Sequence, residues 1–182
     1  MLIRDVITLA AQMLGREDLL GEIPGDTAEG EVGALLRCYN IVENEIALDY
    51  FPLINTERLN VSGGKITFTQ FSYTPVEIKK VTNTSDMGVP FSVYSAYLEV
   101  PKGYSAVNVT YSYVPEKKEL GGETAFTERI SARLLAFGVV SEYCLATGRY
   151  EEGKLWGERY RDALRAVGIL RRPLSVRSRR GV

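Results

Sequence analysis

The hydrophobic pattern of this chain changes its period twice, and this change limits the folds open to it more than any other feature. Near both ends, apolar residues recur at the spacing of amphipathic helices. Between about Glu57 and Val114 they alternate with polar residues, as in half-buried strands. The chain is therefore expected to begin in a helical layer, to leave it for an antiparallel β segment, and to return to it.

Four helices are predicted from this spacing. Two precede the strands, from Leu2 to Met13 and from about Glu29 to Tyr50, where Phe51-Pro52 ends the second helix. Two follow them, from about Ala125 to Ala146 and from about Arg149 to Ala166. The residues expected to face the core are, helix by helix, Leu2, Val6, Leu9 and Met13; Val32, Leu35, Leu36, Tyr39, Val42 and Ile46; Ile130, Leu134, Phe137, Val140 and Cys144; and Leu155, Tyr160 (or Trp156), Leu164 and Val167.

Short strand patterns separated by turns fill the middle segment. The piece Ser62 to Lys65 lacks the second spaced glycine and the Lys-Ser/Thr ending of a phosphate-binding loop, so a hairpin turn is favoured there. Short turns such as Asn83 to Asp86 are expected to keep the strands sequentially adjacent, in a compact antiparallel sheet or small barrel. The patterns are Leu59 and Val61; Ile66 and Phe68; Val76, Ile78 and Val81; Val89, Phe91 and Val93; Tyr97 to Val100; and Val107, Val109, Tyr111 and Tyr113.

These elements describe a mainly helical α+β fold. It is a four-helix unit with an inserted antiparallel β subdomain and an extended basic C-terminal arm. The expected divisions are 1–54 for the N-terminal helices, 55–115 for the inserted β subdomain, 116–168 for the C-terminal helices of the same helical unit, and 169–182 for the arm.

The chain contains no histidine. This removes the commonest general base near neutral pH, the commonest zinc ligand, and every Ser-His or Cys-His pair. The densest carboxylate group before the strands is Glu43, Glu45 and Asp49, where a weak divalent-ion site is the alternative to a solvated helix face. The solvated face is favoured, so we expect no catalytic residue, no cofactor and no metal.

Cysteine usage and hydropathy indicate a cytoplasmic origin. Cys38 and Cys144 lie within helical patterns and are expected to be buried and reduced, with a disulfide as the alternative. No apolar run reaches membrane-spanning length, and the start of the chain lacks the order of a signal peptide. We expect no membrane partner.

The last segment, from Ile169 to Val182, differs from the rest of the chain in charge. It holds five arginines and no acid, which leaves 17 basic against 23 acidic residues elsewhere. Pro173 prevents helix continuation. We expect this arm to dock into a groove on a partner protein, with a frayed terminus as the alternative. The expected docking residues are Leu170, Arg171, Arg172, Leu174, Val176, Arg177, Arg179 and Arg180.

The order of elements resembles that of the head–tail connector (portal adaptor) proteins of tailed bacteriophages. Three segments carry the resemblance: the opening helix Ile3 to Gly15, the helix exit Asn44 to Pro52, and the closing block Ile130 to Trp156. In the closing block, the stretch from Ala136 to Glu152, followed by Trp156-Gly-Glu-Arg-Tyr160, is similar to the paired C-terminal helices of such adaptors. The likeness spans most of the chain. It rests on the order of helices and strands and on the residues of these helical segments, and not on a short diagnostic motif.

The resemblance implies a structural virion protein that forms a homo-oligomeric, dodecameric ring. The ring binds the portal protein on one side and a stopper or tail protein on the other, and DNA passes through it without specific binding. Members of the family do no chemistry, and in similar proteins an extended C-terminal segment docks onto the portal. The channel wall is expected to be acidic or neutral. The residues expected to be exposed there and to carry negative charge are Glu43, Asp49 and Glu116 to Glu119.

Two other classes of protein remain open. Another neck or tail ring component, such as a stopper or terminator, usually lacks the long flanking helices. A nucleic-acid-binding protein would use the arm, but no aromatic residue interleaves its arginines. Five tyrosines suit either subunit interfaces or the covering of a small sheet; they are Tyr94, Tyr97, Tyr104, Tyr111 and Tyr113.

Overall fold

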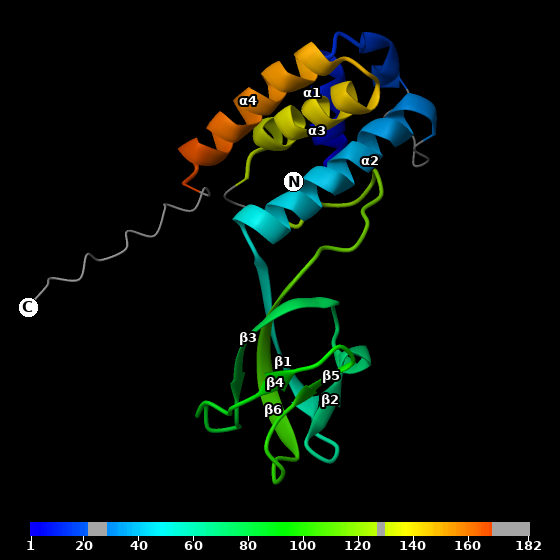
Figure 1. The fold of residues 1–182 in the computed structure, drawn as a ribbon. Helices are drawn as coiled ribbons and strands as arrows, with labels where there is room; N and C mark the ends of the chain where they lie inside the picture. Colours follow the sequence, from blue (N-terminus) through cyan, green and yellow to red (C-terminus); the bar gives the residue numbers. More distant parts are fainter. Residues whose placement is uncertain (22–28, 127–129, 169–182) are drawn as a thin grey trace, which may run out of the picture. The chain divides into compact units, whose positions relative to one another are not determined.

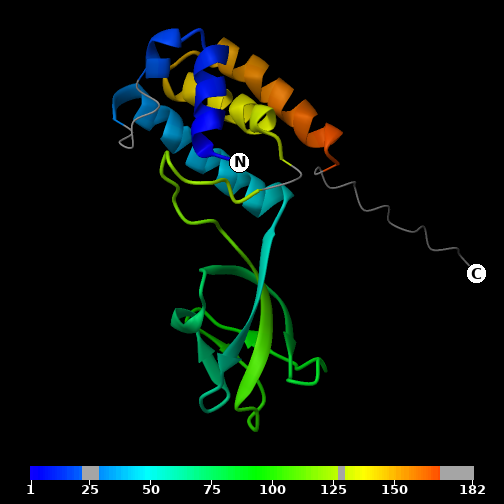
Figure 2. The ribbon, with the colours of Figure 1, turned by 180° about the vertical axis from the view of Figure 1, so that it is seen from behind.

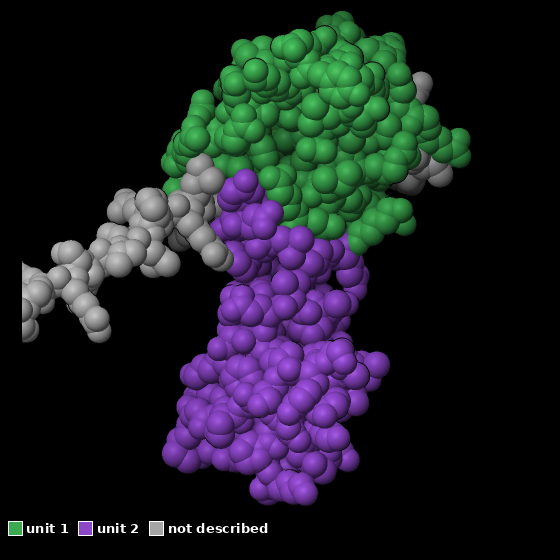
Figure 3. Space-filling view, in the orientation of Figure 1, with its two compact units in different colours: residues 1–45, 117–182 green, residues 46–116 purple. Residues whose placement is uncertain are grey.

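The structure is a computed structural model that describes residues 1–21, 29–126 and 130–168 (Figure 1). Within these ranges it contains four α-helices and two three-stranded antiparallel sheets, which confirms a mixed α+β fold. The chain forms two compact units (Figure 3). We call residues 1–45 together with the chain from Lys117 onward the helical unit, and residues 46–116 the β unit.

The first helix, α1 (Ile3–Met13), buries a different face from the predicted one. Leu2 is 43% exposed, and Leu9 and Met13 are only half-buried, so the predicted stripe was wrong for three of its four residues. Two alanines complete the buried face, which allows neighbouring helices to approach closely. The buried residues of α1 are Ile3, Val6, Ile7, Ala10 and Ala11.

The second helix, α2 (Gly30–Glu45), continues into the π-helical turn Ile46–Tyr50. The amide of Phe51 donates to the carbonyl of Ile46, five residues back, which widens the last turn before Pro52. The predicted core face is confirmed for five of its six residues, and Leu36 is half-buried. The five buried residues are Val32, Leu35, Tyr39, Val42 and Ile46.

The third helix, α3 (Ala132–Ala146), packs against α1, α2 and α4 (Figures 1 and 2). It begins later than the predicted Ala125 because Ser131 caps it, accepting a hydrogen bond from the amide of Leu134 at 3.2 Å. Ile130, Leu134, Val140 and Cys144 are buried as predicted. Phe137 is only half-buried, so the loss of about 3–5 kcal/mol expected for truncating a fully buried phenylalanine does not apply to it.

The fourth helix, α4 (Tyr150–Ala166), approaches α3 through glycines rather than through large apolar residues. A Cβ added to Gly153 would lie 3.0 Å from the Leu145 side chain, and one added to Gly157 would lie 3.1 Å from Ser141 Oγ. Ser141 Oγ donates to the carbonyl of Gly153 at 2.9 Å. Tyr160 and Leu164 are buried as predicted, whereas the predicted core residues Leu155 and Val167 are 51% and 42% exposed.

Gly138 of α3 is the tightest helix contact that a substitution can test. A Cβ there would lie 2.7 Å from Val42 Cγ1 on α2 and 3.1 Å from Tyr160 Cε2 on α4. We expect Gly138→Ala to lower the free energy of unfolding by about 1–3 kcal/mol through overpacking, partly offset by about 1 kcal/mol of helix propensity. Urea denaturation measures the change. The control is Gly88→Ala, where an added Cβ meets nothing within 4 Å; equal stability of the two variants would contradict the expectation.

The β unit contains two sheets rather than one sheet of sequential neighbours. One has the order β1 (Leu53–Asn60), β6 (Ala106–Tyr113), β3 (Pro75–Thr82). The other has the order β2 (Lys65–Thr67), β5 (Tyr97–Glu99), β4 (Ser92–Val93). The predicted sequential adjacency is confirmed for β4 and β5 and was wrong for the other strands.

The turn after β1 explains this difference. It is the predicted tight turn, with Ser62 bridged to Lys65 and with φ of +60° at Gly63 and +82° at Gly64. However, β1 pairs with β6 and β2 pairs with β5, so the turn carries the chain from the first sheet into the second. A Cβ at Gly64 would lie 2.9 Å from the Val100 carbonyl oxygen, which explains the glycine there.

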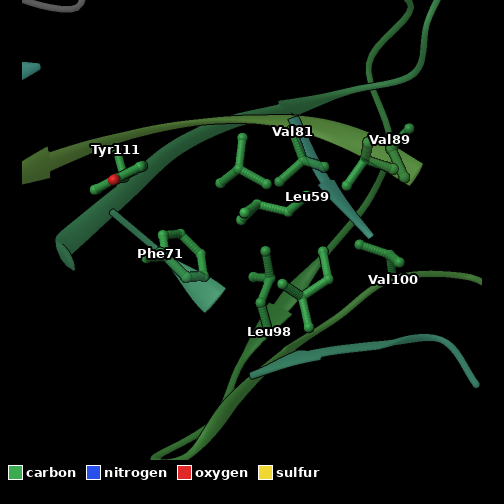
Figure 4. Close-up of a cluster of buried hydrophobic side chains, with 10 residues drawn as sticks. Leu59, Phe71, Val81, Val89, Leu98, Val100 and Tyr111 are labelled. Atoms are coloured by element: carbon green, nitrogen blue, oxygen red, sulfur yellow. The ribbon is translucent and has the colours of Figure 1, made fainter. Parts of the chain in front are cut away.

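Side chains from both sheets and from the loops between them form one apolar cluster (Figure 4). Tyr111 is fully buried in it and donates a hydrogen bond to Glu57 Oε1 at 2.6 Å. The Ser72 amide also donates to Glu57, and this hydrogen bond holds the loop that precedes β3 against β1. Partial burial acts to raise the pKa of Glu57, but the hydrogen bonds from Ser72 and Tyr111 hold that pKa below its usual value. The buried members are Leu59, Ile66, Phe71, Val81, Val89, Leu98, Val100, Val107, Val109 and Tyr111.

Candidate interaction surfaces

The predicted docking residues of the arm lie outside the residues that the structure describes. These are Leu170, Arg171, Arg172, Leu174, Val176, Arg177, Arg179 and Arg180. The structure does describe the end of the helix before them. Gly168 has φ of +70°, and its amide donates to the Arg165 carbonyl, which confirms the predicted helix stop.

The predicted carboxylate group at the end of α2 and in the π-helical turn divides into three different environments. Glu43 is 1% exposed, so its assignment as an exposed carrier of negative charge was wrong. Glu45 accepts a hydrogen bond from Tyr160, and Asp49 is exposed. Among the described residues, no group of three or more acidic or cysteine side chains could hold a metal ion.

Glu43 instead holds the chain that returns from the β unit. Its Oε1 accepts hydrogen bonds from Tyr39 Oη at 2.7 Å, from Thr124 Oγ1 at 3.1 Å and from the Ala125 amide at 2.7 Å. Burial raises the pKa of Tyr39 above its usual value, and the charge of Glu43 raises it further. A carboxylate in this position stabilises the junction between α2 and the segment before α3.

Asn40, one turn earlier on α2, binds the same returning segment. Its Oδ1 accepts from the Lys118 amide at 2.6 Å, and its Nδ2 donates to the Lys118 carbonyl at 3.2 Å. The side-chain amide thereby pairs with both backbone groups of one residue. Asn40 and Glu43 are positioning residues that sequence reasoning did not identify, since their partners lie 78 to 82 residues away.

The tyrosines of the β unit do not act as one group. Tyr111 belongs to the core, and Tyr104 and Tyr113 pack against it. Tyr94 is 45% exposed and stacks on Tyr97 with ring centroids 4.8 Å apart. Lys65 lies 4.5 Å above the Tyr97 ring. Tyr73, which is 38% exposed, stacks on Tyr113 with ring centroids 4.3 Å apart. These two stacked pairs present aromatic surface in the way that the interface interpretation requires.

An apolar groove of about 210 Å³ lies on the β unit beside the edge strands β3 and β4. Its lining is Phe68, Pro75, Val76, Glu77, Ile78 and Val93. Val76 is 51% exposed and Val93 is 55% exposed. Exposed apolar residues gathered around one carboxylate are typical of a protein contact surface.

A second surface joins α3 to α4 through four side chains in a row. The Arg133 guanidinium lies 5.4 Å from the Phe137 ring centroid, and the Phe137 and Trp156 centroids are 5.7 Å apart. The Arg159 guanidinium lies 4.7 Å from the Trp156 ring centroid. We call these four residues the arginine–aromatic row. Sequence reasoning placed Phe137 in the core and missed the row, because its two halves meet only when α3 and α4 pack together.

The two cysteines are both buried and free, so the disulfide alternative was wrong. Burial raises the pKa of the Cys38 thiol to about 11 and also raises that of Cys144. Because the thiolate is the reactive form, we expect a thiol reagent at pH 8 to modify the folded protein many times more slowly than the protein in denaturant. The colour released by a disulfide reagent measures both rates. Equal rates in the two conditions would contradict the burial of these thiols.

Comparisons with models of known protein families and with curated proteins found no match to this chain. Within the described ranges, no helix combines the length and the apolar character that crossing a membrane requires.

Proposed function

We propose that this protein is a structural subunit of a tailed-phage head–tail connector. It forms a homo-oligomeric, dodecameric ring in the neck of the virion, between the portal and a stopper or tail protein. DNA passes through the ring without specific binding, and the protein performs no catalysis. The proposed architecture is a four-helix unit with an inserted antiparallel β subdomain and a basic arm that docks on the portal.

The path of the chain carries this proposal. The chain leaves the helical unit after Glu45 and returns to it at Lys117. Two helices from each end of the chain thus belong to one compact unit, with α3 in contact with the other three. This order of elements is the one on which the resemblance to connector proteins rests.

The surface features support a protein that works through contacts with other proteins. Each subunit of a ring uses two different lateral surfaces, since cyclic contacts run head to tail. The apolar groove of the β unit and the arginine–aromatic row are two surfaces of suitable composition. Asp49, Glu116 and Glu119 are exposed, as is Lys117 between the last two, so they fit the expected acidic or neutral channel wall, whereas the buried Glu43 does not.

Mass measurement tests the proposal directly. The subunit mass is 20.3 kDa, so native mass spectrometry or electron microscopy can count the copies in a ring. We expect a closed ring alone or on a purified portal ring. A protein that stays monomeric and does not bind the portal would contradict the proposal. Binding to duplex DNA that weakens steeply with added salt would favour the nucleic-acid alternative instead.

A further inference from the structure

The arginine–aromatic row is a surface with unused hydrogen-bonding capacity. Arg133 and Arg159 are exposed, and among the described residues neither has a carboxylate partner. A guanidinium that stacks on an aromatic ring keeps its edge N–H groups available for a carboxylate. Trp156 and Phe137 are half-buried between the two arginines, so the row combines apolar area with two cations. Arginine and tryptophan are the residue types that most often dominate binding energy at protein interfaces.

The opposite end of α3 carries the opposite charge. There, Arg16 pairs with both Asp18 and Glu31, whose side chains are 60% and 45% exposed. Glu17 and Glu29 are exposed and lie next to these residues in the sequence, so four carboxylates and one guanidinium belong to this part of the chain. We call Glu17, Asp18, Glu29 and Glu31 the acidic end.

The two surfaces lie near opposite ends of one helix. Arg133 lies in the first turn of α3, whereas Tyr143, near its last turn, interacts with Glu31. Ten residues of helix separate Arg133 from Tyr143, which is about 15 Å. Arg149 lies near the same end but is paired with Glu152, so it adds no net charge. A patch of one sign at each end suits a head-to-tail contact and not a two-fold one.

We propose that the arginine–aromatic row of one subunit binds the acidic end of a second copy of this chain. Arg133 and Arg159 pair with carboxylates of that copy, and Trp156 and Phe137 supply the apolar centre of the contact. Repetition of one contact from copy to copy closes a ring if the rotation between subunits closes. This inference rests on the proposed function, because it identifies the lateral contact of the ring.

Charge reversal tests the contact. One variant is Arg133→Glu with Arg159→Glu, and the other is Glu17→Lys with Glu29→Lys. All four residues are exposed, so both variants should keep the fold, which circular dichroism verifies. We expect the wild-type protein to assemble and each variant alone to sediment as the 20.3-kDa monomer.

Mixing the two variants in equal amounts should restore assembly. The reversed row then faces the reversed acidic end, and the native row of the second variant faces the native acidic end of the first. The control is Lys154→Glu with Arg161→Glu, which makes the same change of charge on the other flank of the buried face of α4. The control variant should assemble as the wild type does.

Several outcomes would overturn the inference. They are assembly of either reversed variant at wild-type concentration, a mixture that remains monomeric, or a wild-type protein that is monomeric at every concentration. Loss of duplex DNA retention in the row variant, with assembly unchanged, would assign the row to phosphate instead. If the wild type still binds a portal ring in any of these cases, the proposed function stands without this contact; if it neither assembles nor binds a portal, both fail.

Discussion

Ending the chain at Gly168 is expected to abolish attachment to the portal and to leave the free energy of unfolding unchanged. The removed segment contains five arginines, no acid, and the apolar residues Leu170, Leu174 and Val176. Gly168 already ends α4, so the cut removes no residue of the described helices. Co-sedimentation with a purified portal ring measures attachment, and urea denaturation measures stability.

Two full-length variants separate the parts of the arm. One replaces its five arginines with glutamine, and the other replaces Leu170, Leu174 and Val176 with serine. Ion pairs at an exposed rim are weakened by salt, whereas apolar contacts are not. Each variant should therefore weaken attachment, and only the serine variant should keep the salt dependence of the wild type. A truncated protein that binds the portal with unchanged affinity would reject the docking role of the arm.

Replacement of Glu43 by leucine is expected to cause a large loss of stability in the helical unit. Leucine fills a similar volume but leaves the Tyr39 hydroxyl, the Thr124 hydroxyl and the Ala125 amide without their acceptor. Hydrogen bonds to charged groups contribute about 1.5–3 kcal/mol, and an unsatisfied buried donor costs about 1–3 kcal/mol. We expect the free energy of unfolding to fall by about 2–4 kcal/mol, measured by urea denaturation.

Two further variants identify the cause of that loss. Glu43→Gln keeps an acceptor oxygen and should lose less stability than Glu43→Leu. Glu119→Leu makes the same change at an exposed position and should alter stability by no more than about 0.5 kcal/mol. If Glu43→Leu were as stable as Glu119→Leu, the buried carboxylate would not be what secures the segment before α3.

Periodicity predicted which elements exist better than it predicted which faces they bury. In α2, large apolar residues mark the buried face, and five of six predictions were right. In α4, the buried face contains Gly153 and Gly157, while Leu155 lies exposed. A pattern of hydrophobic residues cannot detect a helix face that packs closely because it consists of glycines, which have no side chain.

The β unit shows a second reason for failure. The residues Asn55 to Arg58 are polar, yet they belong to β1 because β6 supplies their backbone partners. The Gly63–Gly64 turn was recognised, but nothing local to it shows that its two flanking strands join different sheets. Strand pairing depends on residues about 50 positions away, and such pairings must be found in three dimensions.

The candidate surfaces follow the same rule. Within α3, the spacing of Arg133 and Phe137 is that of helical neighbours, and so is the spacing of Trp156 and Arg159 within α4. Each half of the row could be inferred from the sequence alone. The contact between the halves could not, because it depends on the close approach of the two helices at Gly153 and Gly157.

The pairing of β1 with β6 has an evolutionary consequence. Leu53 and Tyr113 are register partners, so the strands that enter and leave the β unit begin and end side by side. In the helical unit, Asn40 and Glu43 accept hydrogen bonds from the backbone amides of Lys118 and Ala125. These bonds do not involve the residues inserted between α2 and Lys118. The inserted segment can therefore change in length and sequence, or be replaced by another domain, while the contacts between the flanking helices stay the same.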